Sequence, residues 1–135
     1  MGHEKHPRLN ESASPTDASD AARARREQEA TSHLLNLGAD QLERRPWRPA
    51  PAPPTAVDLT QFALWKSGEL SGAELLSALS LLQAARDEVD GAEIGLLFSA
   101  RNIGLTWAQI AEATGFRSPQ ACQQHFTRLS SRKGL

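Results

Sequence analysis

Residues 106–129, TWAQIAEATGFRSPQACQQHFTRL, predict two short helices joined by a tight turn. Thr106 and Gln109 form a capping box, in which the side chain of each residue binds the backbone N–H of the other. Gly115 is expected to end the first helix, because glycine readily adopts the left-handed conformation of a sharp turn. Ser118, followed by a proline, favours the start of a second helix. Such a short connection makes the two helices cross steeply, as in a helix-turn-helix.

The second of these helices separates into an apolar face and a polar face. At 100° per residue, Cys122, Phe126 and Leu129 lie within about 60° of one another, and they are expected to pack inward against Trp107 and Ile110. The opposite face holds four uncharged polar residues with an arginine at its edge: Gln120, Gln123, Gln124, Thr127 and Arg128. Glutamine can pair bidentately with adenine in the major groove, so the four uncharged residues are the expected DNA base contacts.

Positive charge gathers towards the C-terminus. Residues 99–135 carry a net charge of +4, whereas residues 57–98 carry −5 and residues 1–56 carry 0. A local basic patch is typical of a phosphate-binding surface, although the net charge of −1 for the whole chain does not indicate nucleic acid. The expected contacts to the DNA backbone are Arg117, Ser118, Arg128, Arg132 and Lys133.

The segment also resembles known DNA-binding proteins. LTWAQIAEATGF at 105–116 resembles the helix-turn-helix of sigma-factor region 4, and the longer stretch 100–129 resembles small actinobacterial helix-turn-helix proteins, including a nucleoid-associated type. The matching positions are Arg101, Gly104, Trp107, Ala111, Gly115, Ser118, Gln120, Ala121, Phe126, Arg128 and Leu129. The resemblance implies DNA binding but carries no target sequence.

This chain departs from the two patterns in two ways. The turn is one residue longer than in the sigma-like pattern, since the inward residue after Gly115 is Cys122 rather than Ala121. Gln123 and Gln124 stand where the actinobacterial proteins often carry two arginines. Fewer positive charges predict weaker nonspecific binding or a greater dependence on base contacts.

The rest of the chain is expected to comprise an arm, a linker and a helical domain. Residues 1–45 predict a flexible, largely disordered arm, with a helix over 16–37 that is either partly formed and solvated or ordered by a partner. Five prolines in residues 46–56 favour a stiff polyproline linker. Residues 57–135 predict an all-α fold, a compact bundle of four to five short helices ending in a helix-turn-helix at 106–130.

Further helix signals lie between the linker and the helix-turn-helix. Ser71 and Glu74 form another capping box. Apolar residues at three- and four-residue spacings then predict a helix over 75–89, and Asp90 is expected to cap the next one. Trp65 is expected to be a core residue.

Other functional classes lack support in the sequence. Cys122 is the sole cysteine, which leaves no intrachain disulfide or cysteine-based zinc site, and neither a metal nor a cofactor is expected. No phosphate loop, HExxH motif or nucleophile elbow is present, so the chain is not expected to be an enzyme. No apolar run approaches the ~18 residues of a membrane span, and a cytoplasmic, nucleoid location without a membrane partner is expected.

These features are compatible with two functions. The first is a transcriptional regulator or nucleoid-associated protein that binds double-stranded DNA. A homodimer is the usual route to specificity for such a small module, and the helix over 75–89 or the N-terminal arm could supply the contact. The alternative is a protein-interaction module that docks on the transcription machinery, such as RNA polymerase or a sigma factor. The acidic segment 57–98 would suit a basic partner.

Overall fold

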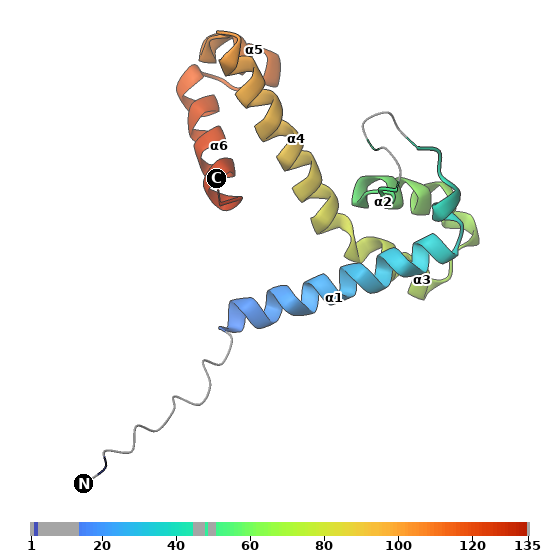
Figure 1. Cartoon of the computed structure of the whole chain (residues 1–135). Coiled ribbons are helices and arrows are strands. Elements are labelled where there is room, and N and C mark those ends of the chain that lie inside the picture. The colour runs from blue at the N-terminus through green and yellow to red at the C-terminus, as the bar shows by residue number, and fades with distance from the viewer. Residues whose placement is uncertain (1, 3–13, 45–47, 49–50, 135) are drawn as a thin grey trace. The chain divides into compact units, whose positions relative to one another are not determined.

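The computed structural model describes residues 2, 14–44, 48 and 51–134 (Figure 1). These residues form six α-helices and two 3-10 helices, with no strand among them: α1 (Pro15–Asn36), η1 (Ala39–Gln41), α2 (Ala56–Trp65), η2 (Ser67–Glu69), α3 (Gly72–Ser80), α4 (Leu82–Asn102), α5 (Trp107–Thr114) and α6 (Pro119–Arg132). The all-α prediction is confirmed, with five helices after residue 55. The start of the arm and much of the proline linker lie outside the described residues.

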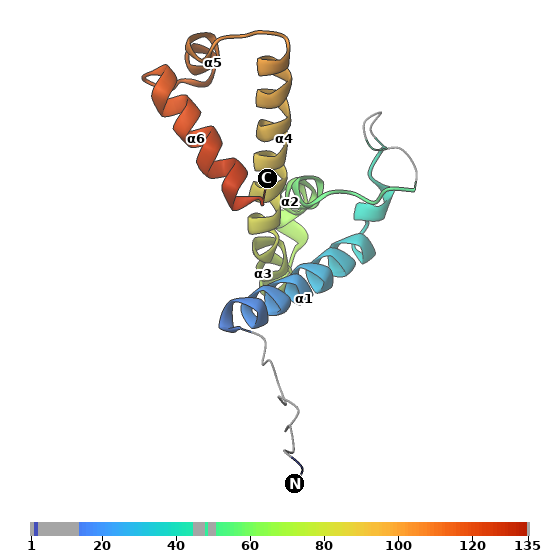
Figure 2. The same cartoon turned by 60° about the vertical axis from the view of Figure 1, so that its left-hand side comes forward.

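The chain divides into two compact units. The N-terminal unit comprises residues up to 54 together with 58–81, and the C-terminal unit comprises 55–57 and 82–135. This division differs from the expected one, which placed all helices after residue 57 in one domain. The reason is that α1, the helical part of the expected arm, packs against α3 and shares a core with α2 (Figure 2).

The core of the N-terminal unit joins side chains from separate stretches of sequence: Ala30, Leu34, Ala39, Leu59, Phe62, Ala63 and Leu81. Gly38, with φ of 119°, lets the chain turn from α1 into η1. The expectation that Trp65 belongs to this core is wrong, because its side chain is 75% exposed and lies under the Lys66 ammonium, 4.7 Å from the ring centre. On α2 it lies about 120° round from Leu59, which faces the core.

Helix α4 differs from its expected form. It runs unbroken through Asp90, so the prediction of a new helix start there is wrong, and the break falls at Leu81 instead. A glycine inside a helix costs only about 1 kcal/mol relative to alanine, so Gly91 does not interrupt it. The Asp90 carboxylate contacts Arg132 of α6 rather than capping a helix. Residues 75–89 are consequently divided between α3 and α4.

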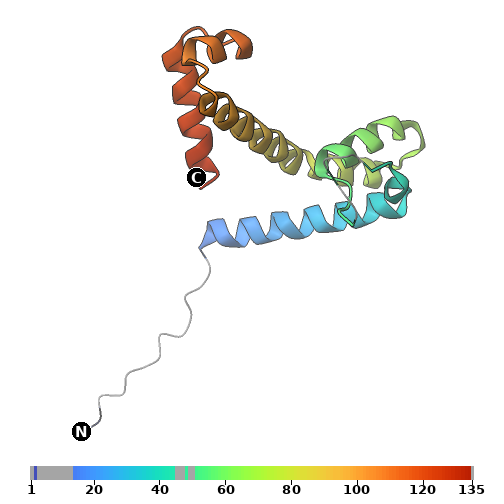
Figure 3. The same cartoon turned by 45° about the horizontal axis from the view of Figure 1, so that its top comes forward.

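The C-terminal unit has a core of its own. Leu97 of α4, Ile110 and Ala111 of α5 and Cys122 of α6 are buried together, with five partly buried apolar residues around them: Ala100, Leu105, Trp107, Phe116 and Phe126. Figures 2 and 3 show α5 beyond the end of α4, and α6 turning back towards α4. The predicted inward seam of α5 and α6 is thus confirmed, and it leaves the opposite face of α6 open.

Candidate nucleic-acid interface

The turn between α5 and α6 is built by local signals that the sequence predicted. Thr106 caps α5, accepting from the Gln109 N–H at 3.1 Å while its own N–H donates to the Gln109 Oε1 at 2.8 Å. Gly115 ends α5 in the left-handed conformation, with φ of 81°. The Ser118 Oγ then accepts from the Ala121 N–H at 3.1 Å and caps α6. These contacts fix where α6 begins and which face it turns outward.

The outward face of α6 presents the predicted polar row. Five exposed side chains line one shallow surface hollow: Gln120, Gln123, Gln124, Thr127 and Arg128. Among the described residues, none forms a hydrogen bond with the amide groups of the three glutamines. Thr127 differs from them, because its hydroxyl donates to the Gln123 carbonyl oxygen at 3.0 Å. The glutamine amides therefore remain available to a ligand, whereas the threonine is partly satisfied within the helix.

The basic residues of this region fall into two pairs. Arg117 and Arg128 are exposed, and no described residue forms an ion pair with either guanidinium. Arg132 instead lies 3.4 Å from the Asp90 Oδ2, and the Lys133 Nζ lies 2.9 Å from the Asp87 Oδ1. The four cations expected to contact phosphates are thus not equivalent, since two of them pair with carboxylates of α4.

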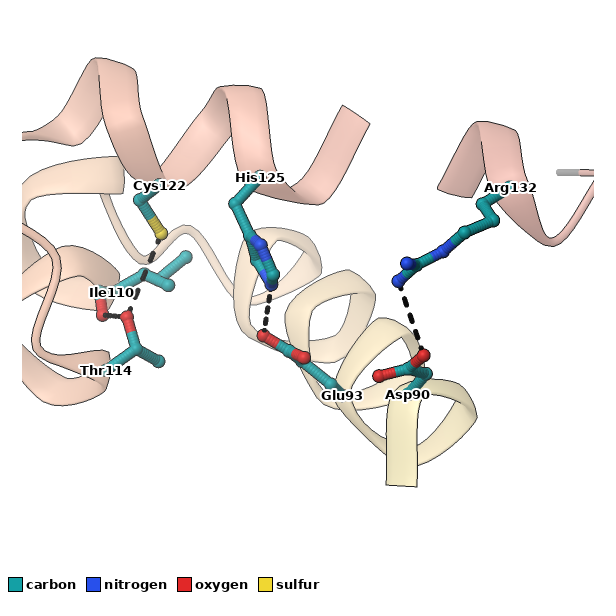
Figure 4. A network of polar contacts seen from close by, with 7 residues as sticks. All are labelled: Asp90, Glu93, Ile110, Thr114, Cys122, His125 and Arg132. Carbon is teal, nitrogen blue, oxygen red and sulfur yellow. Dashed lines mark hydrogen bonds and ion pairs between the residues drawn. The ribbon is translucent and has the colours of Figure 1, made fainter. Parts of the chain in front are cut away.

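The carboxylates that contact Arg132 and Lys133 belong to a row of three acidic residues on α4. We name it the acidic row: Asp87, Asp90 and Glu93. Their three-residue spacing puts them on one side of the helix. The Glu93 Oε1 lies 2.9 Å from the His125 Nε2, and Figure 4 shows this contact beside that of Asp90 with Arg132. Of these carboxylates, only Asp90 was considered from the sequence, as the expected cap of a new helix. Their i, i+3, i+6 spacing was the signal that could have revealed a partner helix.

A further contact ties the end of α5 to α6. The Thr114 Oγ1 donates to the Ile110 carbonyl oxygen at 2.7 Å and lies 3.9 Å from the Cys122 Sγ (Figure 4). Cys122 is buried, in agreement with the small apolar role expected for it. The thiol therefore serves packing at the helix crossing rather than surface chemistry.

Trp107 is held inside the unit as expected. Its ring centre lies 5.7 Å from that of Phe126 and 5.1 Å from the guanidinium carbon of Arg101. Arg101 also donates to the Leu105 carbonyl oxygen at 2.8 Å. This ring is therefore engaged by an aromatic ring and a guanidinium of its own unit, which does not favour a role as a platform for base stacking.

The described part of the chain shows neither a metal cluster nor a membrane-spanning helix. No three His, Cys, Asp or Glu side chains there gather closely enough to hold a metal ion. None of its helices combines the length and the apolarity that a membrane span needs.

No protein-family model matches the chain, and neither the curated proteins nor the solved structures include a significant match to it. The resemblance of residues 100–129 to actinobacterial and sigma-like helix-turn-helix proteins therefore stays a prediction.

Proposed function

We propose that the chain binds double-stranded DNA by inserting α6 into the major groove, and that it acts as a transcriptional regulator or a nucleoid-associated protein. The observation that carries the proposal is the row of unpartnered glutamine amides, which line one hollow on the exposed face of a well-anchored helix. Glutamine is suited to bidentate pairing with adenine at the floor of that groove. An ordinary solvated helix face would instead carry lysine and glutamate.

The surroundings of the row suit a phosphate backbone. Arg117 immediately precedes the N-cap of α6, and Arg128 borders the hollow at the other end of the row. The N-terminal end of α6 carries a partial positive charge that favours an anion near Ser118. Together these groups would fix the position of α6 on the duplex, while the glutamines would read base edges.

The test uses fluorescence anisotropy of labelled duplex DNA titrated with the full-length chain at about 50 and 200 mM salt. The whole chain is needed because a fragment starting at residue 57 would cut through the N-terminal unit. The Arg117→Ala/Arg128→Ala variant is expected to weaken binding to all sequences and to lower the salt slope by about 1.8, or 0.9 for each lost phosphate contact. The matched control is Arg25→Ala/Arg26→Ala, which removes two exposed arginines from α1.

A second variant, Gln123→Ala/Gln124→Ala, tests the reading of bases. It is expected to change the preference among sequences by about 1–3 kcal/mol at the affected base pairs and to leave the salt slope unaltered. Absence of binding by the full-length chain at low salt would overturn the proposal. That result would favour the alternative, in which the helical units dock on RNA polymerase or a sigma factor.

A further inference from the structure

Thr127 lies on the outward face of α6 but differs from the glutamines beside it in the groups that it offers. Its side chain is exposed and lines the same hollow as Gln120 and Gln124. Its hydroxyl donates to the carbonyl oxygen of Gln123, four residues earlier, at 3.0 Å. The hydroxyl proton is thus used within the helix, and the oxygen is turned towards the backbone. The methyl group on the same Cβ is therefore the part of Thr127 that is left to face the hollow.

The state of this hydroxyl limits what Thr127 can recognise on a base pair. A hydroxyl that already donates has no proton for the N7 or O6 of guanine, the N7 of adenine or the O4 of thymine, which are all acceptors. Its oxygen can still accept from the amino group of adenine or cytosine, but it is turned towards the backbone. The methyl group has one matching partner, because thymine alone among the four bases carries a methyl group in the major groove. Thr127 is thus suited to an apolar contact with thymine.

The position of Thr127 on α6 fits it to the base pairs that the glutamines would contact. At about 100° per residue, Gln120, Gln124 and Thr127 lie within about 60° of one another. At a rise of about 1.5 Å per residue, Thr127 lies about 10.5 Å along the helix from Gln120. That length corresponds to about three steps between base pairs, at about 3.4 Å each. These side chains can therefore contact one short run of consecutive base pairs.

We propose that Thr127 contacts the 5-methyl group of a thymine, and that α6 consequently selects a short run of A·T base pairs. The inference rests on the proposed binding of α6 in the major groove, and it adds the class of DNA sequence that the helix reads. Glutamine pairs with adenine, and every A·T pair presents both an adenine edge and a thymine methyl group in that groove. The glutamines and Thr127 therefore favour the same base pairs, the former by hydrogen bonds and the latter by an apolar contact.

The test measures fluorescence anisotropy of the full-length chain with three labelled duplexes that differ only in their core. One core alternates A·T base pairs, the second has deoxyuridine in place of each thymidine, and the third alternates G·C base pairs. Deoxyuridine pairs as thymidine does but lacks the 5-methyl group. The wild-type chain is expected to bind the A·T duplex most tightly. Deoxyuridine should weaken its binding about fourfold, which corresponds to about 0.8 kcal/mol for one buried methyl group.

Two substitutions of Thr127 separate the methyl group from the hydroxyl. Thr127→Val keeps a methyl group and loses the hydroxyl, and it should retain both the affinity for the A·T duplex and the weakening by deoxyuridine. Thr127→Ser keeps the hydroxyl and loses the methyl group. It should bind the A·T duplex about fourfold more weakly and should not distinguish thymidine from deoxyuridine.

The matched control is Thr31→Ser on α1. The Thr31 hydroxyl likewise donates to the carbonyl oxygen four residues earlier, that of Glu27, at 2.7 Å. This variant loses the same methyl group outside α6 and should bind all three duplexes as the wild-type chain does. Far-UV circular dichroism checks that each variant stays helical.

The possible failures are distinguishable. If the wild-type chain binds the A·T and deoxyuridine duplexes equally, or if Thr127→Ser still distinguishes them, the thymine contact is overturned while DNA binding stands. A loss of affinity in Thr127→Val but not in Thr127→Ser also overturns it, because the hydroxyl would then be the group that contacts the base. Tighter binding of the G·C duplex overturns the selection of A·T pairs. Failure to bind any of the three duplexes at low salt overturns the proposed function itself.

Discussion

The substitution Leu34→Ala is expected to destabilise the N-terminal unit by about 3 kcal/mol. Leu34 lies near the end of α1 and is fully buried, at 0% exposure, in the core that also contains Leu59 and Phe62. Removing three buried carbon atoms loses about 2.4 kcal/mol of transfer free energy, at about 0.8 kcal/mol each. The cavity left behind raises the total into the range of about 2–5 kcal/mol that such substitutions show. This loss is comparable with the whole stability of a small unit.

Hydrogen exchange measured by mass spectrometry resolves the effect along the chain. Leu34→Ala should increase exchange throughout α1, α2 and α3, and urea unfolding followed by circular dichroism should show a lower midpoint. The helices of the C-terminal unit should keep their protection, because their core of Leu97, Ile110 and Cys122 is separate. The control is Leu37→Ala, three residues away and 38% exposed, which should cost no more than about 0.5 kcal/mol.

Two results would refute this reasoning. If Leu34→Ala costs as little as Leu37→Ala, then α1 is a solvated arm, as the sequence suggested, and does not pack on the unit. If α5 and α6 lose protection from hydrogen exchange to the same extent as α1, the two units unfold together. Having separate cores would then not make the units independent in stability.

Three further predictions concern a cap, a pair of carboxylates and a titrating group. Ser118→Ala should lower the stability of the C-terminal unit by about 1 kcal/mol in thermal unfolding, and Ser118→Asp should restore it, because either Ser or Asp can cap α6. Asp87→Asn/Asp90→Asn should release Lys133 and Arg132, tighten DNA binding at low salt and steepen the salt slope by about 1.8, whereas Glu112→Gln on α5 should do neither. Hydrogen bonds from the Ser71 backbone N–H and hydroxyl hold the pKa of Glu74 below its ordinary value of 4.5. The resulting stabilisation is present above that value and is lost as the pH falls through the lowered pKa, so Glu74→Gln should reduce the acid sensitivity of the urea midpoint between about pH 5 and pH 2.

Caps and turns were predictable because their physical causes lie within a few residues. Ser71, Thr106 and Ser118 each bind backbone groups three residues on, and Gly115 adopts its left-handed conformation at the end of one short helix. The polar row of α6 was predictable for a similar reason, since a helix repeats every 3.6 residues whatever it packs against.

The remaining features depend on residues that are distant in the sequence. Only two residues of α1 are buried, Ala30 and Leu34, and their partners include Leu59 and Leu81. A stripe that thin does not by itself distinguish a docked helix from a solvated one. Asp90 carries the local signature of a cap, yet its partner is Arg132, 42 residues away. The cap expected at Asp90 was wrong because a tertiary contact outweighed a local preference, whereas the helix expected over 16–37 does form as α1.

The ion pairs of Arg132 and Lys133 with α4 help to distinguish two kinds of DNA-binding protein, a regulator that reads sequence and a protein that packages the chromosome. Four cations in contact with phosphates would give a salt slope of about −3.6, whereas Arg117 and Arg128 alone would give about −1.8. A protein that coats DNA without regard to sequence depends mainly on such contacts. The acidic row of α4 reduces them by holding Arg132 and Lys133, while it leaves the glutamine row untouched. Contacts with base edges must then supply a larger part of the binding free energy. This favours the proposal of a regulator that reads sequence over that of a protein that packages the chromosome.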